Sequence, residues 1–294
     1  MSGHPLISPE DLLTHLDDPL WVIVDCTFEL SEPFQGESEY LQSHIPGAVF
    51  ADLERDLSAV RDGANGRHPL PTPQALAEVF SRLGIDDSCM VVGYDRSGGP
   101  YASRLWWSLR YLGHFGVAVL DGGYPAWVRA GYPVRSGSET RDGARFVPSV
   151  QTRMLVDADE IIGRLDTRTL RLLDARAPER YRGDEEPIDP VAGHIPGAAN
   201  VFWNDNLDEE GRFNLSALLE ARYRRVLGRY PPSAAVAYCG SGVTGCHLLL
   251  AMEQAGIRGA RLYAGSWSEW ASDPTRPVAL GDEPPAVGSS SLDS

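Results

Sequence analysis

Positive charge is scarce in this chain of 294 residues, which has 26 Lys and Arg against 41 Asp and Glu. The resulting net charge of −15 and a pI near 4.8 repel a phosphate backbone and anionic lipid headgroups. We therefore expect neither nucleic acid nor a membrane surface among its partners.

Cysteine is also rare. Cys26, Cys89, Cys239 and Cys246 are scattered, with no CxxC pair and no Cys/His cluster at the spacing of zinc ligands. The apolar runs are too short to span a bilayer, and the first residues carry no basic and apolar leader pattern. These absences predict a soluble, cytoplasmic protein with reduced thiols, and we expect no metal or other cofactor.

Apolar residues, in contrast, make up 43% of the chain and include seven Trp, which is enough to build sizeable cores. The length suggests two ordinary domains. A search for internal similarity supports this division, because four short segments return in the same order about 150 residues later. The pairs are VIVD 22–25 with RLLD 171–174, HIPGA 44–48 with 194–198, VVGYDRSGG 91–99 with VAYCGSGVTG 236–245, and LDGGYPAW 120–127 with LYAGSWSEW 262–270.

Each copy alternates short apolar runs with amphipathic stretches, which is typical of the α/β class. We predict two tandem domains, each a parallel sheet flanked by helices. Strands are expected in the second copy at 170–175, 198–201, 235–239 and 260–265, and helices at 158–165, 216–227 and 244–256. The predicted division is an N-terminal domain 1–132, a linker 133–153, a catalytic C-terminal domain 154–280 and a mobile tail 281–294.

The segment from Cys239 to Gly245 is a glycine-rich loop between an apolar strand and an apolar helix. Ligands of open α/β sheets bind at the carboxyl ends of the strands. There a short loop can point successive backbone N–H groups inward, at the positive end of the next helix, and so favour a thiolate. Cys239 is thus a candidate nucleophile. The alternative is a buried structural cysteine.

The first copy has Asp95 at the position that aligns with Cys239. A carboxylate cannot replace a thiol nucleophile, so we expect the N-terminal domain to be catalytically silent and to build a wall of the pocket.

The tandem domains, the paired HIPGA motifs and the CGSGVTGC loop together resemble the two-domain rhodanese superfamily of sulfurtransferases. The loop itself is similar to that of the 3-mercaptopyruvate sulfurtransferases, since thiosulfate-specific rhodaneses more often carry basic residues after the cysteine. The resemblance implies that Cys239 takes sulfur from 3-mercaptopyruvate as a persulfide and passes it to a thiol acceptor, such as thioredoxin or a small dithiol, or to cyanide.

The resemblance also implies roles for further residues. Ser241, His68 and Glu54 match a proton relay, although Glu54 stands where the family usually has Asp. Arg180 matches the first of two arginines that clamp the donor carboxylate. The second is missing, with Ile188 near its place, which should weaken mercaptopyruvate binding unless Arg182 or an arginine of the first domain substitutes. Further candidates for the lining of the site are Tyr101, Gly240, Gly242, Val243 and Thr244.

Three alternatives accompany this interpretation. Thiosulfate remains a possible donor, and a non-catalytic rhodanese-like binding module is the alternative outside enzymes. A cysteine-dependent phosphatase needs an Arg six residues after its Cys, where this chain has Gly245. The acidic run 183–189 is expected to be a solvated loop.

Overall fold

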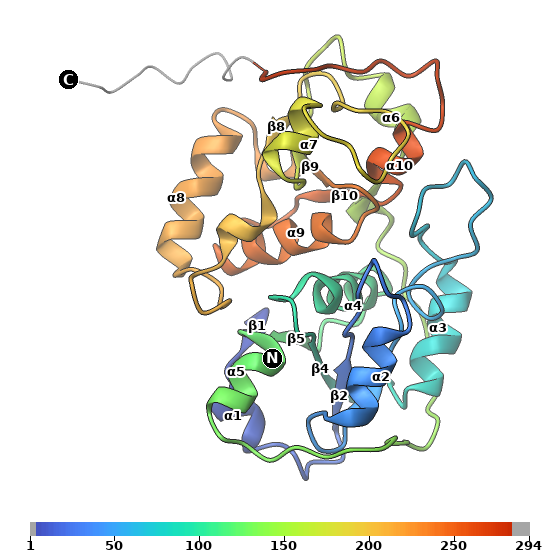
Figure 1. Ribbon diagram of the computed structural model, residues 1–294, viewed down its shortest axis with the longest axis vertical. Helices are drawn as coiled ribbons and strands as arrows, with labels where there is room; N and C mark the ends of the chain where they lie inside the picture. The colour runs from blue at the N-terminus through green and yellow to red at the C-terminus, as the bar shows by residue number, and fades with distance from the viewer. Residues whose placement is uncertain (1–3, 284–294) are drawn as a thin grey trace. The chain divides into compact units, whose positions relative to one another are not determined.

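The computed structural model describes residues 4–283 (Figure 1), so most of the predicted tail 281–294 lies outside the described residues. The chain divides into two compact units. Of the described residues, the first unit contains 4–60, 68–152 and 207–213, and the second contains 61–67, 153–206 and 214–283. Segment 61–67 thus lies in the second unit and segment 207–213 in the first, although their positions in the sequence suggest the reverse.

The first unit is built on a five-stranded parallel sheet in the order β1-β5-β4-β2-β3. Its strands are β1 (Leu6–Ile7), β2 (Trp21–Asp25), β3 (Val49–Phe50), β4 (Met90–Tyr94) and β5 (Val117–Leu120). Its helices are α1 (Pro9–Leu13), α2 (Gln35–Gln42), α3 (Pro73–Arg82), α4 (Pro100–Tyr111) and α5 (Gly123–Arg129).

The second unit repeats this plan with the order β6-β10-β9-β7-β8. Its strands are β6 (Leu155–Val156), β7 (Arg171–Asp174), β8 (Ala199–Asn200), β9 (Ala235–Tyr238) and β10 (Arg261–Tyr263). Its helices are α6 (Ala158–Ile162), α7 (Pro178–Arg182), α8 (Ser216–Leu227), α9 (Thr244–Gln254) and α10 (Ser266–Trp270). Short 3₁₀ turns lie at Thr152–Met154, Trp203–Asn206 and Pro232–Ala234.

Each strand of the first sheet has a counterpart at the same place in the second, as expected for a duplicated domain. The predicted α/β class with parallel sheets flanked by helices is therefore confirmed. Among the described residues, no helix is long and apolar enough to cross a membrane.

The central strands are continuous apolar runs because helices cover both faces of a parallel sheet. All four residues of β9 are buried, and Val236 and Tyr238 pack in one cluster with Leu172, Trp267 and Trp270. The helix α9 begins directly after the loop at the end of β9 and packs on β9 and β10. Burial of this strand and helix fixes both ends of the loop between them.

The sequence pattern missed the shortest elements. The two-residue strand β6 and the five-residue helices α7 and α10 were not predicted, because such segments span too little chain for a hydrophobic period. The helix expected over 158–165 ends at Ile162, and the one expected over 244–256 ends at Gln254, just before Gly256 at φ +74°.

In the first unit, Asp95 follows β4 and is fully buried at the start of α4. Its two carboxylate oxygens accept four backbone N–H groups, from Ser97, Gly99, Tyr101 and Ala102, at 2.8–3.0 Å. Burial raises the pKa of this carboxyl, and the four N–H donors oppose that shift. The loop of the first unit is therefore an anion nest that its own side chain fills.

Replacing Asp95 with Ala should destabilise the first unit by about 2 to 4 kcal/mol, because buried N–H donors lose their acceptor. The measurement is chemical denaturation of the variant and the parent. Asp87→Ala is the matched control, since that aspartate is exposed in the loop before β4 and should change stability by less than about 0.5 kcal/mol. Equal stability of both variants would contradict the nest.

Candidate functional site

Cys239 lies at the carboxyl end of the central strand β9, with only 2% of its surface exposed. The loop that follows leads into α9, whose first residue is Thr244. The amino end of a helix carries partial positive charge. The sequence thus places the thiol between the carboxyl end of a buried strand and the amino end of a helix.

The sulfur of Cys239 accepts the backbone N–H of Gly242 at 3.1 Å. Gly242 has φ +77°, and a Cβ atom there would overlap the carbonyl of Ala264. Only glycine fits this conformation and this contact without strain. Gly242 therefore shapes the turn that directs an N–H group at the sulfur.

The start of α10 braces the other side of the loop. The backbone N–H of Trp267 donates to the carbonyl of Cys239, and that of Ser268 donates to Gly240, both at 2.9 Å. The N–H of Cys239 in turn donates to the hydroxyl of Ser266 at 3.0 Å. Sequence reasoning did not assign these residues to the site. The repeated LYAGSWSEW segment at 262–270 was the available signal.

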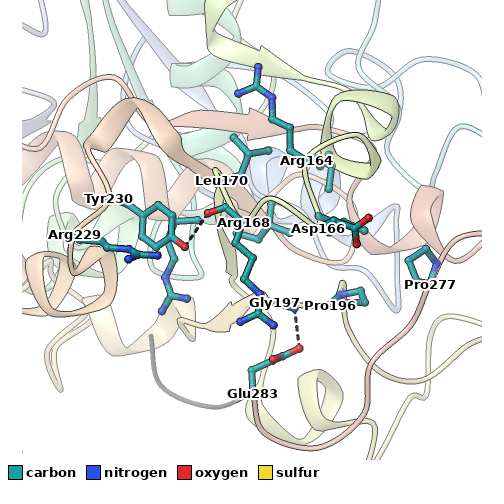
Figure 2. Close-up of a pocket in the computed structure, with 14 residues that line it drawn as sticks. Arg164, Asp166, Arg168, Leu170, Pro196, Gly197, Arg229, Tyr230, Pro277 and Glu283 are labelled. Atoms are coloured by element: carbon teal, nitrogen blue, oxygen red, sulfur yellow. Dashed lines mark hydrogen bonds between the residues drawn. The ribbon is translucent and has the colours of Figure 1, made fainter. Parts of the chain in front are cut away.

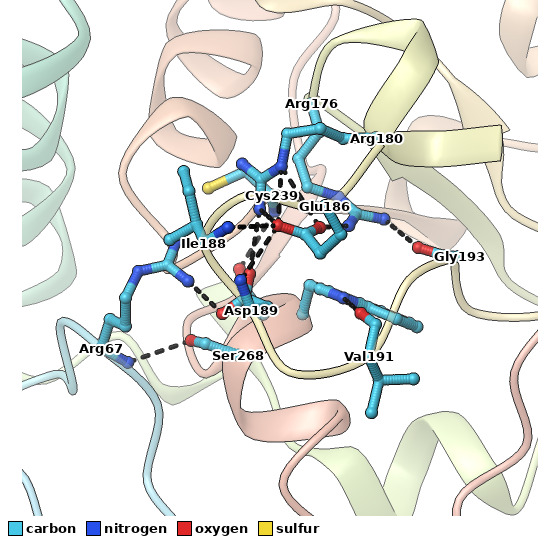
Figure 3. Close-up of polar contacts among 12 residues, drawn as sticks. Arg67, Arg176, Arg180, Glu186, Ile188, Asp189, Val191, Gly193, Cys239 and Ser268 are labelled. Carbon is cyan, nitrogen blue, oxygen red and sulfur yellow. Dashed lines mark hydrogen bonds and ion pairs between the residues drawn. The ribbon is translucent and has the colours of Figure 1, made fainter. Parts of the chain in front are cut away.

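Three arginines and three carboxylates form a network beside this loop (Figure 3). Its members are Arg67, Arg176, Arg180, Asp174, Glu186 and Asp189. Formal charges in the network balance, which offsets the cost of burying them.

Arg176 is the buried member, with 1% of its side chain exposed. Its guanidinium pairs with Asp174 at 2.6 Å and Glu186 at 3.4 Å and donates to the carbonyl of Gly193 at 2.7 Å. It also lies over the ring of Trp267, with the guanidinium carbon 4.7 Å from the ring centroid. Burial by itself lowers the pKa of Arg176, but the neighbouring carboxylates hold it above its ordinary value. This arginine has a structural role.

Arg180 lies on α7 and is 17% exposed. It binds Glu186 through Nε at 3.1 Å and Nη2 at 2.7 Å, and Nη2 also contacts Asp189 at 3.0 Å. Glu186 further accepts the backbone N–H groups of Ile188 and Asp189, at 3.1 and 3.0 Å. Two carboxylates thus fix the guanidinium that the family resemblance assigns to the donor.

The prediction that 183–189 is a solvated loop is wrong for two of its residues. Asp184 and Glu185 are exposed, as expected. The side chains of Glu186 and Asp189, however, are only 4% and 3% exposed. They are buried because each pairs with guanidiniums.

Arg67 was not named from the sequence, which allowed only for an unspecified arginine of the predicted first domain. It ends the segment 61–67, which belongs to the second unit, and it pairs with Asp189. A Cβ built on Gly240 would lie 2.6 Å from Nη2 of Arg67 and 3.6 Å from Nη1 of Arg180. Both guanidiniums therefore flank the residue next to Cys239.

The other predicted site residues divide between the units. Gly240, Ser241, Gly242 and Val243 lie in the loop with Cys239, and Thr244 begins α9. Ser241 is buried, whereas Ile188, near the expected place of a second arginine, is 41% exposed.

Glu54, His68 and Tyr101 belong to the first unit. There the structure brings His68 and Glu54 together, with Nε2 and Oε1 3.9 Å apart. Tyr101 lies in the first turn of α4, where its ring packs edge-on against Phe28 with centroids 5.4 Å apart.

A separate pocket of about 470 Å³ lies at the opposite, amino end of the second sheet (Figure 2). Arg171, the first residue of β7, lines it with Arg164, Arg168, Arg229, Asp166 and Glu283, among others. None of the described residues that line this pocket is a cysteine, so we do not place the thiol chemistry there.

Comparison with known proteins gives a consistent result. The family described as rhodanese-like domain matches residues 8–130 and 157–273. A probable 3-mercaptopyruvate sulfurtransferase of Pseudomonas aeruginosa is 48% identical over 96% of this chain and 100% of its own length. A putative thiosulfate sulfurtransferase, SseB of Mycobacterium tuberculosis, is 40% identical over 95% of this chain and 98% of its own.

A solved structure agrees with these matches. The crystal structure of SseA from Escherichia coli, described with the 3-mercaptopyruvate sulfotransferases, aligns with a TM-score of 0.78 at 30% identity, over 91% of this chain and 100% of that one.

Replacing Glu186 with Ala should destabilise the second unit by about 2 to 4 kcal/mol, because Arg176 and Arg180 lose a shared buried partner. Glu185→Ala is the matched control, since the adjacent side chain is exposed. Chemical denaturation measures both. Unchanged stability of Glu186→Ala would show that the network contributes nothing to folding.

Proposed function

This chain belongs to the rhodanese family of sulfurtransferases, and we propose that it moves sulfur from 3-mercaptopyruvate to a thiol through a persulfide on Cys239. The observation that carries the proposal is the sulfur of Cys239 held at the amino end of α9 by the N–H of Gly242. A cysteine attacks through its sulfur, and the N–H of Gly242 already points at that atom.

The chemistry has two steps. The Cys239 thiolate attacks the donor's sulfur, an S–S bond forms, the donor's C–S bond breaks, and the electron pair leaves with pyruvate as its enolate. A proton then converts the enolate into pyruvate. In the second step an acceptor thiolate attacks the outer sulfur, the S–S bond breaks, and the Cys239 thiolate is regenerated. The two sulfurs that join in the persulfide lose two electrons in total, and the donor carbon takes them up when its C–S bond is replaced by a C–H bond.

We assign the proton of the first step to a relay of Ser241, His68 and Glu54. Ser241 follows the nucleophile by two residues. The support for the other two is their mutual contact, since the carboxylate of Glu54 lies 3.9 Å from Nε2 of His68, and a carboxylate beside an imidazole is a common arrangement for proton transfer.

A carboxylate-bearing donor is favoured by the type of cation next to the loop. The loop itself has no charged side chain, but the guanidiniums of Arg67 and Arg180 flank Gly240. A guanidinium matches the planar carboxylate in a bidentate manner. Thiosulfate is the second candidate donor, because a relative at 40% identity carries that name.

The acceptor and the compartment are parts of the same proposal. A thiol acceptor such as thioredoxin or a small dithiol completes the second step. All four cysteines are free thiols, which suits a reducing cytoplasm. Asp95 fills its own nest with a carboxylate, so the first unit takes no part as a nucleophile.

Incubation with 3-mercaptopyruvate and no acceptor should add one sulfur to Cys239, because the persulfide accumulates when no acceptor thiol removes its outer sulfur. Mass spectrometry should find the addition removed by cyanide or dithiothreitol and absent from Cys239→Ser. Cys246→Ser is the control, since that buried thiol donates to the carbonyl of Gly242 and should leave the addition intact. Sulfur on Cys246 or Cys26 instead would reject the assignment.

Steady-state kinetics with one common acceptor should give a higher kcat/KM for 3-mercaptopyruvate than for thiosulfate. Arg180→Ala should lower the value for 3-mercaptopyruvate by roughly 10- to 150-fold, the effect of losing one or two charge-assisted hydrogen bonds. If thiosulfate is the better donor by tenfold or more, the donor proposal is wrong.

A further inference from the structure

The segment 61–67 belongs to the second unit and contacts Ser268, one of the residues that brace the Cys239 loop. The backbone N–H of Arg67 donates a hydrogen bond to the hydroxyl of Ser268 at 3.0 Å. The carbonyl of Ala64 accepts the hydroxyl of Ser272 at 3.2 Å. Gly66 has φ +87° and its Cβ position lies 2.9 Å from the carbonyl of Gly265, so a side chain would not fit. The backbone therefore places Arg67 at the loop.

The side chain of Arg67 is held as well as its backbone. One carboxylate, Asp189, bridges two guanidiniums, since Oδ1 accepts from Arg67 and Oδ2 accepts from Arg180 (Figure 3). Asp189 is 3% exposed, so the bridge is sheltered from solvent. It keeps two positive groups at one place, where they would otherwise repel each other.

Neither guanidinium is saturated by this bridge. A guanidinium has five N–H donors. Within the part of the chain that the structure describes, Nε of Arg67 is buried and has no hydrogen-bond partner. The Nη2 group of Arg67 and the Nη1 group of Arg180 both lie beside Gly240, next to the nucleophile.

From this geometry we infer that Arg67 is the second arginine of the donor site and binds the donor carboxylate together with Arg180. The inference rests on the proposed function and names a residue for it. Arg67 then takes the role that Ile188 cannot fill, although it comes from a different part of the chain. The ligand chemistry is a 2-oxo acid carboxylate.

The remaining arginines near the site do not meet the same conditions. Arg176 is 1% exposed and paired with two carboxylates, so it is closed to a ligand. Arg182 pairs with Asp184 at 2.7 Å and with Glu179 at 3.8 Å, whereas the three described atoms nearest to a Cβ built on Gly240 belong to Arg67 and Arg180. Arg67 and Arg180, at 18% and 17% exposure, are both fixed and accessible.

The test compares 3-mercaptopyruvate with 1-mercaptopropan-2-one, which has a methyl group in place of the carboxylate. Arg67→Ala should raise KM for 3-mercaptopyruvate about 10- to 100-fold with kcat within threefold, because a charge-assisted contact is lost. Turnover of the methyl ketone should stay within threefold. Arg67→Lys should recover only part of the loss, since it keeps the charge without the fork.

Arg182→Ala is the matched control and should keep the parent's KM, because its partners are exposed carboxylates of α7 and the following loop. An unchanged KM in Arg67→Ala, or an equal loss with both donors, would overturn the inference. A loss with both donors is the mark of a merely structural arginine.

Direct titration with pyruvate separates the inference from the proposed function, because pyruvate carries the carboxylate and no sulfur. The parent should bind pyruvate and Arg67→Ala should bind it at least tenfold more weakly. If this holds while 3-mercaptopyruvate is not turned over, the arginine pair stands and the proposed donor fails. If both proteins bind pyruvate equally, Arg67 is not part of the site.

Discussion

The buried carboxylate of Glu186 is the group on which the arrangement of the site depends. It accepts from the guanidiniums of Arg176 and Arg180 and from two backbone N–H groups of its own loop. A charge that is 4% exposed is tolerable only with such partners. The same contacts that satisfy Glu186 orient α7, close the loop after it, and aim one edge of Arg180 at Gly240.

The fold could be predicted from the sequence because hydrophobic periodicity is a local property and the repeated segments can be found by comparing the chain with itself. The alternating apolar runs predicted four of the five strands of the second sheet, all but β6, and the glycine-rich loop placed Cys239 at a strand end. The burial of Glu186 and Asp189 could not be predicted in this way. A run of acidic residues is expected to be exposed unless the arginines that pair with it are known, and these arginines are residues 67, 176 and 180.

In both copies of the duplicated loop, backbone N–H groups point at the side chain that follows the central strand, but that side chain differs between the copies. In the first unit the carboxylate of Asp95 takes four N–H groups and is sealed in the core. In the second unit the thiol of Cys239 takes the N–H of Gly242 and sits beside two guanidiniums. The nest of the first unit is filled by its own side chain and contributes to folding, whereas the sulfur of the second unit is the group that we propose to react.

Because 61–67 belongs to the second unit, the structural units of this molecule do not coincide with the two sequence repeats. The sequence repeats suggest two modules that could be cut apart, each complete in itself. A fragment beginning after residue 152 would keep β9, α9 and Cys239 but would lack Arg67, and Asp189 would be left bridging to one guanidinium only. Because each unit contains a short segment from the other half of the sequence, neither half is complete when it is expressed or transplanted alone.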